Sequence, residues 1–82
     1  MKMDRNKTFQ TSDFPLATFL YAKGVILRSI IDSPYDRQRK VFLFDEPPAD
    51  LLSSFQSGKA EINVLAINNA HTALMAMLRG RR

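Results

Sequence analysis

The sequence predicts a single α+β domain with the element order β-α-β-β-α-α, and three observations support this prediction. Residues 25–31 and 39–44 are rich in β-branched and aromatic side chains and are separated by turn formers, which is typical of a β-hairpin. The flanking segments combine helix-capping residues with apolar residues at spacings of three and four. The chain has 82 residues, which suits one domain. We therefore expect a small antiparallel sheet with the helices packed mainly on one face.

The predicted hairpin carries large apolar side chains on both of its faces. Because side chains alternate across a strand, we place Leu27, Phe42 and Phe44 on the core side. The second side then receives the other large apolar residues of the hairpin, which are Ile26, Ile30, Val41 and Leu43. A half-exposed hairpin normally has one polar face, so something must cover this second side. We expect it to be a dimer or partner interface.

The segment before the hairpin predicts a short strand and a helix. Residues 7–11, with Phe9 as the single apolar anchor, suit a short edge strand. The side chains of residues 11–13 can cap a helix whose first turn tolerates Pro15. That helix should end at Gly24, because glycine readily takes the left-handed conformation of a helix C-terminus. Residues 1–6 are charged and have nothing to bury, so we expect a flexible arm outside the domain.

The segment after the hairpin predicts two helices. A short helix should begin at residues 47–50 and end at Gly58, with acidic side chains suited to its positive N-terminal end at Asp45, Glu46 and Asp50. Asn63 should cap a long last helix. Its apolar stripe is formed by Val64, Ile67, His71, Leu74 and Leu78. The domain is therefore expected to span residues 7–80, followed by a basic tail of residues 81–82.

Composition narrows the class of protein further. The absence of cysteine excludes a disulfide framework, and 45% hydrophobic residues are enough for a folded core. The charged start of the chain is not followed by an apolar run, so we expect no secretory signal. We also expect no membrane span and a cytoplasmic location. The net charge of +4 permits contact with nucleic acid without requiring it.

The sequence shows no complete set of catalytic, cofactor-binding or metal-binding residues. A metal site or catalytic pair at Asp45, Glu46 and Asp50 is the less favoured interpretation of these carboxylates beside their place at the helix N-terminus. His71 is the single imidazole, and a lone histidine lacks the partners of a metal site or a general-base pair. The three glycines lie far apart, so none forms a phosphate-binding loop. We therefore expect a protein that is not an enzyme and holds no cofactor.

A set of short patterns extends over nearly the whole chain. The patterns are Phe9-x-Thr11-x-Asp13, Leu16-Ala17-x-Phe19-Leu20, Gly24, Val41-Phe42-Leu43-Phe44 and Phe55-x-x-Gly58-Lys59-Ala60. Together they resemble a family of small uncharacterised domains found largely in bacterial phages and integrative elements. The resemblance runs from about Lys7 to Leu78, and Pro15 departs from the helix former expected there. The resemblance implies a mobile-element setting and carries over no catalytic or ligand residue.

Two functions of different classes follow from these expectations. The first is a protein-interaction module, a homodimer that buries the second hairpin face and binds a host or element-encoded protein with its remaining surface. Inhibition of a host enzyme is one form that such binding can take.

The alternative is a nucleic-acid-binding accessory protein that uses basic residues of the hairpin and of the C-terminus. Tyr35 at the hairpin tip could stack on a base, and the cations could contact phosphates. The residues of this alternative site are Arg28, Tyr35, Arg37, Arg39, Lys40, Arg79, Arg81 and Arg82. A solvated basic loop is the simpler interpretation of the same residues.

Overall fold

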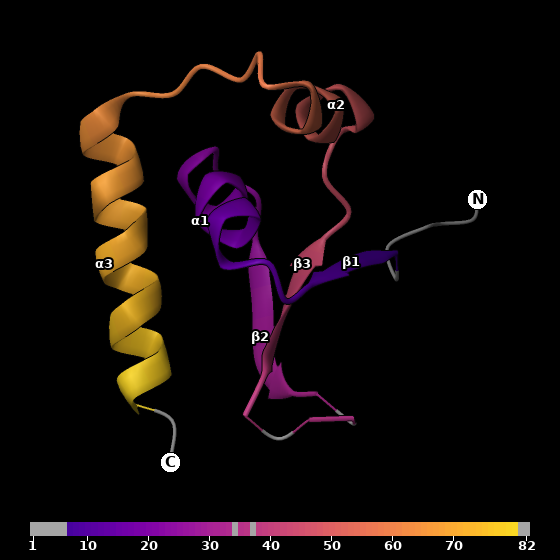
Figure 1. Cartoon of the computed structure of the whole chain (residues 1–82), viewed down its shortest axis with the longest axis vertical. Coiled ribbons are helices and arrows are strands. Elements are labelled where there is room, and N and C mark those ends of the chain that lie inside the picture. The colour runs from indigo at the N-terminus through magenta and orange to yellow at the C-terminus, as the bar shows by residue number, and fades with distance from the viewer. Residues whose placement is uncertain (1–6, 34, 37, 81–82) are drawn as a thin grey trace.

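The computed structural model describes residues 7–33, 35–36 and 38–80. The expected arm of residues 1–6 and tail of residues 81–82 lie outside them. Six elements follow one another along the chain (Figure 1): β1 (Thr8–Thr11), α1 (Phe14–Ala22), β2 (Leu27–Asp32), β3 (Lys40–Asp45), α2 (Ala49–Ser57) and α3 (Val64–Gly80). This is the predicted β-α-β-β-α-α order.

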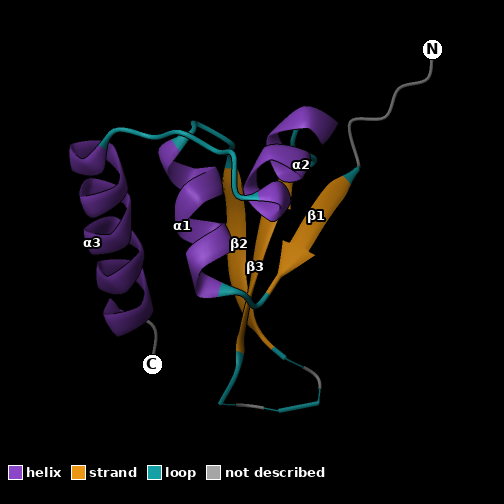
Figure 2. Cartoon of the chain, turned by 45° about the horizontal axis from the view of Figure 1, so that its top comes forward, coloured by secondary structure: helices purple, strands orange, loops and turns teal. Residues whose placement is uncertain are grey.

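The three strands form one antiparallel sheet with β3 in the centre, in the order β1-β3-β2. Both α1 and α2 lie in front of the strands in Figure 2, and α3 lies on the far side of α1. The shortest dimension of the molecule is 19 Å, and packed layers lie about 10 Å apart, so one sheet and one layer of helices account for its thickness. The predicted α+β class, with helices packed mainly on one face, is confirmed.

Local signals place the helix ends where the sequence predicts them. The Asp13 side chain accepts a hydrogen bond from the Leu16 N–H at the start of α1. Asn63 Oδ1 accepts from the N–H groups of Leu65 and Ala66, at 2.8 and 3.1 Å, and so caps α3. Gly24 and Gly58 follow α1 and α2 with φ of +91° and +78°, the left-handed conformation that closes a helix.

The core lies between α1 and the inward face of the sheet, and α3 packs against the side of α1. Helix α1 is buried from Leu16 to Leu20, about one and a half turns, which fits its contacts with these two neighbours. The buried cluster consists of Leu16, Ala17, Phe19, Leu20, Ile30, Phe42, Phe44 and Leu74. Helix α2 has no fully buried residue and contacts this cluster through partly buried side chains such as Phe55, whose ring lies 5.1 Å from that of Phe19.

The prediction that Ile30 lies on the second face of the hairpin is wrong. Leu27 is paired with Phe44 and Ile30 with Phe42, so a step of three positions along β2 lies opposite a step of two positions along β3. A β-bulge at Arg28 accounts for the extra residue and reverses the alternation after it. Ile30 is therefore buried, with 6% of its surface exposed, while Ile31 turns to the outer face and is 40% exposed.

The predicted stripe on α3 packs along only part of its length. Leu74 is fully buried and Ile67 and Leu78 pack against the core, but Val64 is 71% exposed. His71 is exposed and contacts the Phe14 ring edge to face, with the centroids 5.3 Å apart. Among the described helices, none is long and apolar enough to cross a membrane.

Candidate functional site

The outer face of the sheet carries an apolar strip that crosses β2 and β3. Ile31 pairs with Val41 and Ser29 with Leu43, and paired residues share a face of the sheet. Because Phe42 and Phe44 point to the core, these residues point away from it. Val41 and Leu43 are half-buried and Ile31 is exposed. Ile26, just before β2, is 55% exposed. We call Ile26, Ile31, Val41 and Leu43 the outer strip.

Two ion pairs flank the outer strip. The Arg28 guanidinium donates two hydrogen bonds to the Asp45 carboxylate, from Nε at 2.6 Å and from the terminal nitrogen at 3.0 Å. The hydrogen bond and the charge of Asp45 both raise the pKa of Arg28 above its ordinary value. Lys40 forms a second pair with Asp32 near the hairpin loop. The apolar side chains therefore lie between two ion pairs. A partner can cover the strip without burying Arg28 or Lys40 as an unpaired charge.

The structure brings together only part of the alternative nucleic-acid site. Tyr35 is 95% exposed at the hairpin tip. Arg39 lies with Leu78 in the wall of one surface hollow, so the loop end of the hairpin adjoins the end of α3, where Arg79 follows. Arg28 and Lys40 are held by carboxylates, which reduces their availability to phosphate. The predicted residues Arg37, Arg81 and Arg82 lie outside the described residues.

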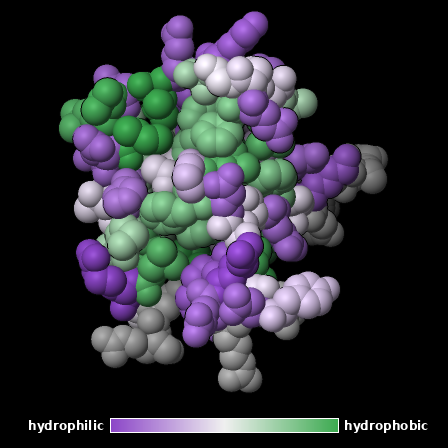
Figure 3. Space-filling model, viewed as in Figure 1, coloured by the Kyte–Doolittle hydropathy of each residue, from purple (hydrophilic) through white to green (hydrophobic). Residues whose placement is uncertain are grey.

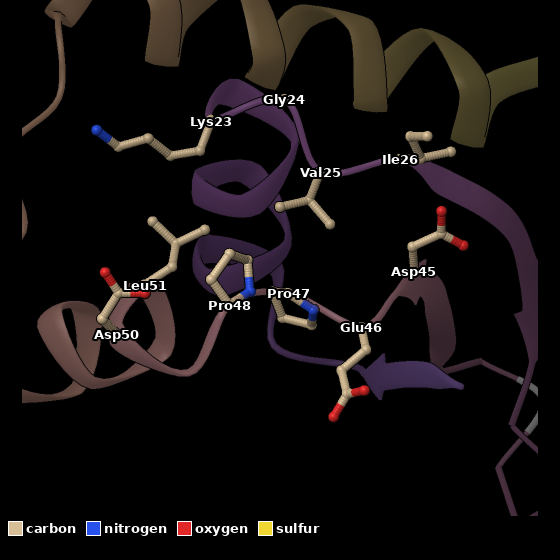
Figure 4. Close-up of a pocket in the computed structure, with 10 residues that line it drawn as sticks. All are labelled: Lys23, Gly24, Val25, Ile26, Asp45, Glu46, Pro47, Pro48, Asp50 and Leu51. Carbon is tan, nitrogen blue, oxygen red and sulfur yellow. The ribbon is translucent and has the colours of Figure 1, made fainter. Parts of the chain in front are cut away.

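A hollow at the ends of β2 and β3 gathers the three acidic residues that the sequence singles out. It has a volume of about 460 Å³ and includes Lys23, Asp45, Glu46 and Asp50 in its wall. In Figure 4 the carboxylates of Glu46 and Asp50 lie on opposite sides of the two prolines that separate them. Asp45 is held by Arg28, and Asp50 occupies the first turn of α2. The ion pair therefore accounts for Asp45, and the dipole of α2 accounts for Asp50. Within the described residues, no three metal-binding side chains gather.

The sequence gives no sign of an apolar groove that opens between α1, α3 and the connector after α2. Its volume is about 550 Å³. Phe14, Phe19, Phe55, Ile62, Ile67 and His71 are among its lining residues. The groove exists because α2 and the connector stand off from the start of α3, a tertiary arrangement that no local pattern encodes.

A second exposed apolar region lies over the start of α3. Figure 3 shows strongly hydrophobic side chains gathered there. The exposed large side chains of this region are Val64 and Leu65, at 71% and 67%. The predicted stripe includes Val64 but not Leu65, which does not fit its steps of three and four and lies on the side of α3 that faces away from α1.

The fold and these surfaces define a small α+β domain whose sheet has helices against one face and an apolar strip on the other. The family described as "Domain of unknown function (DUF5659)" matches residues 6–72, and the chain belongs to this family. The expected membership of an uncharacterised domain family is thereby confirmed. Comparison with the curated proteins gives no match, and comparison with the solved structures gives none.

Proposed function

We propose that this protein is a non-enzymatic interaction module that binds another protein through the outer strip of its sheet. The supporting observation is that Ile26 and Ile31 are 55% and 40% exposed on the face opposite the core. They adjoin the half-buried Val41 and Leu43. Apolar side chains grouped on one face of a small domain are typical of a surface that a partner covers.

The partner in this proposal is a host or element-encoded protein, and the setting is the cytoplasm of a cell that carries a mobile element. This setting comes from the sequence resemblance to domains of phages and integrative elements. The interaction module itself is proposed to be a homodimer. Inhibition of a host enzyme by occupation of its surface is one way in which such a module can act.

Affinity capture from the native host, followed by mass spectrometry, tests the outer strip. Bait proteins are the wild type, Ile31→Lys in the strip and Ser53→Lys on the exposed side of α2. Both substitutions add one positive charge at an exposed position, and nuclease treatment removes partners tethered by nucleic acid. We expect a protein that the wild type and Ser53→Lys retain and that Ile31→Lys loses. Retention of the same proteins by all three baits would contradict the proposed surface.

Nucleic-acid binding is the second candidate function, and the exposed Tyr35 ring on the hairpin loop that also carries Arg39 favours it. An exposed aromatic side chain close to a cation can stack on a base while the cation contacts phosphate. An electrophoretic shift with random DNA and RNA at low salt tests this function. We expect a salt-sensitive shift that Tyr35→Ala with Arg39→Ala weakens, if this candidate is right. The absence of any shift would reject it.

A further inference from the structure

Most of α3 is free of acidic and basic side chains apart from His71. Residues 64–78 contain no Asp, Glu, Lys or Arg, whereas 24% of the whole chain is charged. At that average, about one residue in four of this segment would carry a charge. Exposed helix faces normally carry charged residues, and depletion of charge is typical of the centre of a protein interface.

The neutral surface faces outward at the edge of the molecule. Helix α3 packs against α1 through its buried side, which includes Ala70 and Leu74. In Figures 1 and 2 it is the outermost helix, and none of the other labelled elements lies on its outer side. The positions opposite the buried side are exposed and recur at steps of four, three and four. They are Leu65, Asn69, Thr72 and Ala76, which we call the outer seam.

The outer seam is complementary to itself when two helices run antiparallel. A twofold axis midway between Asn69 and Thr72 sets Leu65 opposite Ala76 of a second copy, a large side chain against a small one. It also sets Asn69 opposite Thr72, so two hydrogen-bonding side chains meet. Near such an axis each residue approaches its own copy, so a charge there would meet an equal charge. The neutrality of the outer seam removes that repulsion.

The charges beyond the ends of the seam also favour the antiparallel arrangement. Exposed Arg79 follows the seam, and exposed Glu61 precedes α3. Antiparallel helices bring Arg79 of one copy within about a turn of Glu61 of the other, where opposite charges attract. Parallel helices would instead bring the two Arg79 side chains together.

We infer that a second copy of this chain covers the outer seam, forming an antiparallel α3 pair across a twofold axis. This places the contact of the proposed homodimer on α3 instead of on the second hairpin face, and it leaves both outer strips free for partners. The helix has 17 residues and is about 25 Å long and about 10 Å across, so one side of it offers on the order of 400 Å². A standard interface buries about 800 Å² per partner, so we expect the α3 pair to be a weak dimer.

Sedimentation velocity over about 1 to about 100 μM, the concentration range of weak specific association, tests the pair. We expect the wild-type mass to rise with concentration from 9.3 kDa toward twice that value. Thr72→Arg sets two cations close together at the axis and should weaken dimerisation by at least about tenfold. Ser53→Arg, a matched change on the exposed side of α2, should leave it unchanged, as should Ile31→Lys in the outer strip. Circular dichroism checks that every variant keeps its helices.

Cross-linking gives a second readout, because the chain has no cysteine. A short bis-maleimide should join Thr72→Cys chains into dimers and leave Ser53→Cys chains as monomers.

A wild type that stays at the monomer mass at every concentration would overturn the inference. A dimer that Ile31→Lys dissociates and Thr72→Arg does not would place the contact on the sheet and also overturn it. Loss of partner capture by Ile31→Lys is a separate result, so the outer strip and the α3 pair can fail independently.

Discussion

At the scale of single residues, the described helices are defined by side chains and glycines that satisfy their terminal backbone groups. Asn63 accepts hydrogen bonds from two N–H groups of the first turn of α3. Gly24 and Val25 donate to the Tyr21 and Leu20 carbonyls after α1, which is the bond pair of the Schellman motif. Each of these contacts is local in sequence, so its effect on stability can be measured by one substitution.

Asn63→Ala should lower the free energy of unfolding by about 1 kcal/mol, because the N–H groups of Leu65 and Ala66 lose their acceptor. Chemical denaturation measures the loss. Asn68→Ala is the matched control, since Asn68 is exposed inside α3 and alanine is the better helix former there. It should leave stability unchanged or raise it by a few tenths of a kcal/mol. Equal losses in both variants would show that the cap contributes nothing specific.

At the scale of elements, the bulge in β2 decides which isoleucine supports the core. Ile30 faces Phe42 beneath α1, while its neighbour Ile31 faces Val41 on the outer side. Without the bulge the two side chains would exchange faces, and the outer strip would contain Ile30. The bulge also turns Arg28 toward Asp45, because the inserted residue makes no pair of its own in the ladder.

Ile30→Ala should destabilise the protein by about 2 to 5 kcal/mol, the usual range for truncation of a buried aliphatic side chain. Ile31→Ala should cost less than about 1 kcal/mol, because its side chain is 40% exposed. Thermal and urea denaturation of both variants measure the two values. If Ile31→Ala proved the more costly change, the register of β2 with β3 would be wrong.

At the scale of the whole molecule, α1 is the central element and α2 the peripheral one. The five residues from Leu16 to Leu20 are buried between the sheet and α3, whereas α2 has no buried residue. Stability is therefore expected to be uneven along the chain, because local opening is easiest where few apolar contacts are broken.

Amide hydrogen exchange should show this difference directly. We expect the amides of α1 and β3 to be protected up to the free energy of global unfolding, and those of α2 to exchange earlier through local opening. Phe55→Ala removes the ring contact with Phe19 and should speed exchange in α2 while leaving β3 unchanged. Equal protection of α1 and α2 in the wild type would contradict this ranking.

The α+β class, the order of the elements and the helix ends could be predicted from the sequence, because caps, glycines and apolar spacing are local signals. Most of the outer strip could be predicted as well, since alternation assigns Val41 and Leu43 to the face opposite Phe42 and Phe44. Ile30 was misplaced because one inserted residue in β2 leaves no distinct mark in the sequence. The apolar groove likewise depends on how α2 and the connector lie beside α3.

The sequence by itself therefore determined which segments become helices and strands, because those choices depend on contacts within a few residues. Only the tertiary structure decided which side chains of those segments are buried. Ile31 and Leu65 are exposed and Ile30 is buried because of the strand register and because α1, which has 9 residues, meets only one side of the 17-residue α3. These are contacts between segments far apart in the chain, and the residues that they leave uncovered form the outer strip and the outer seam.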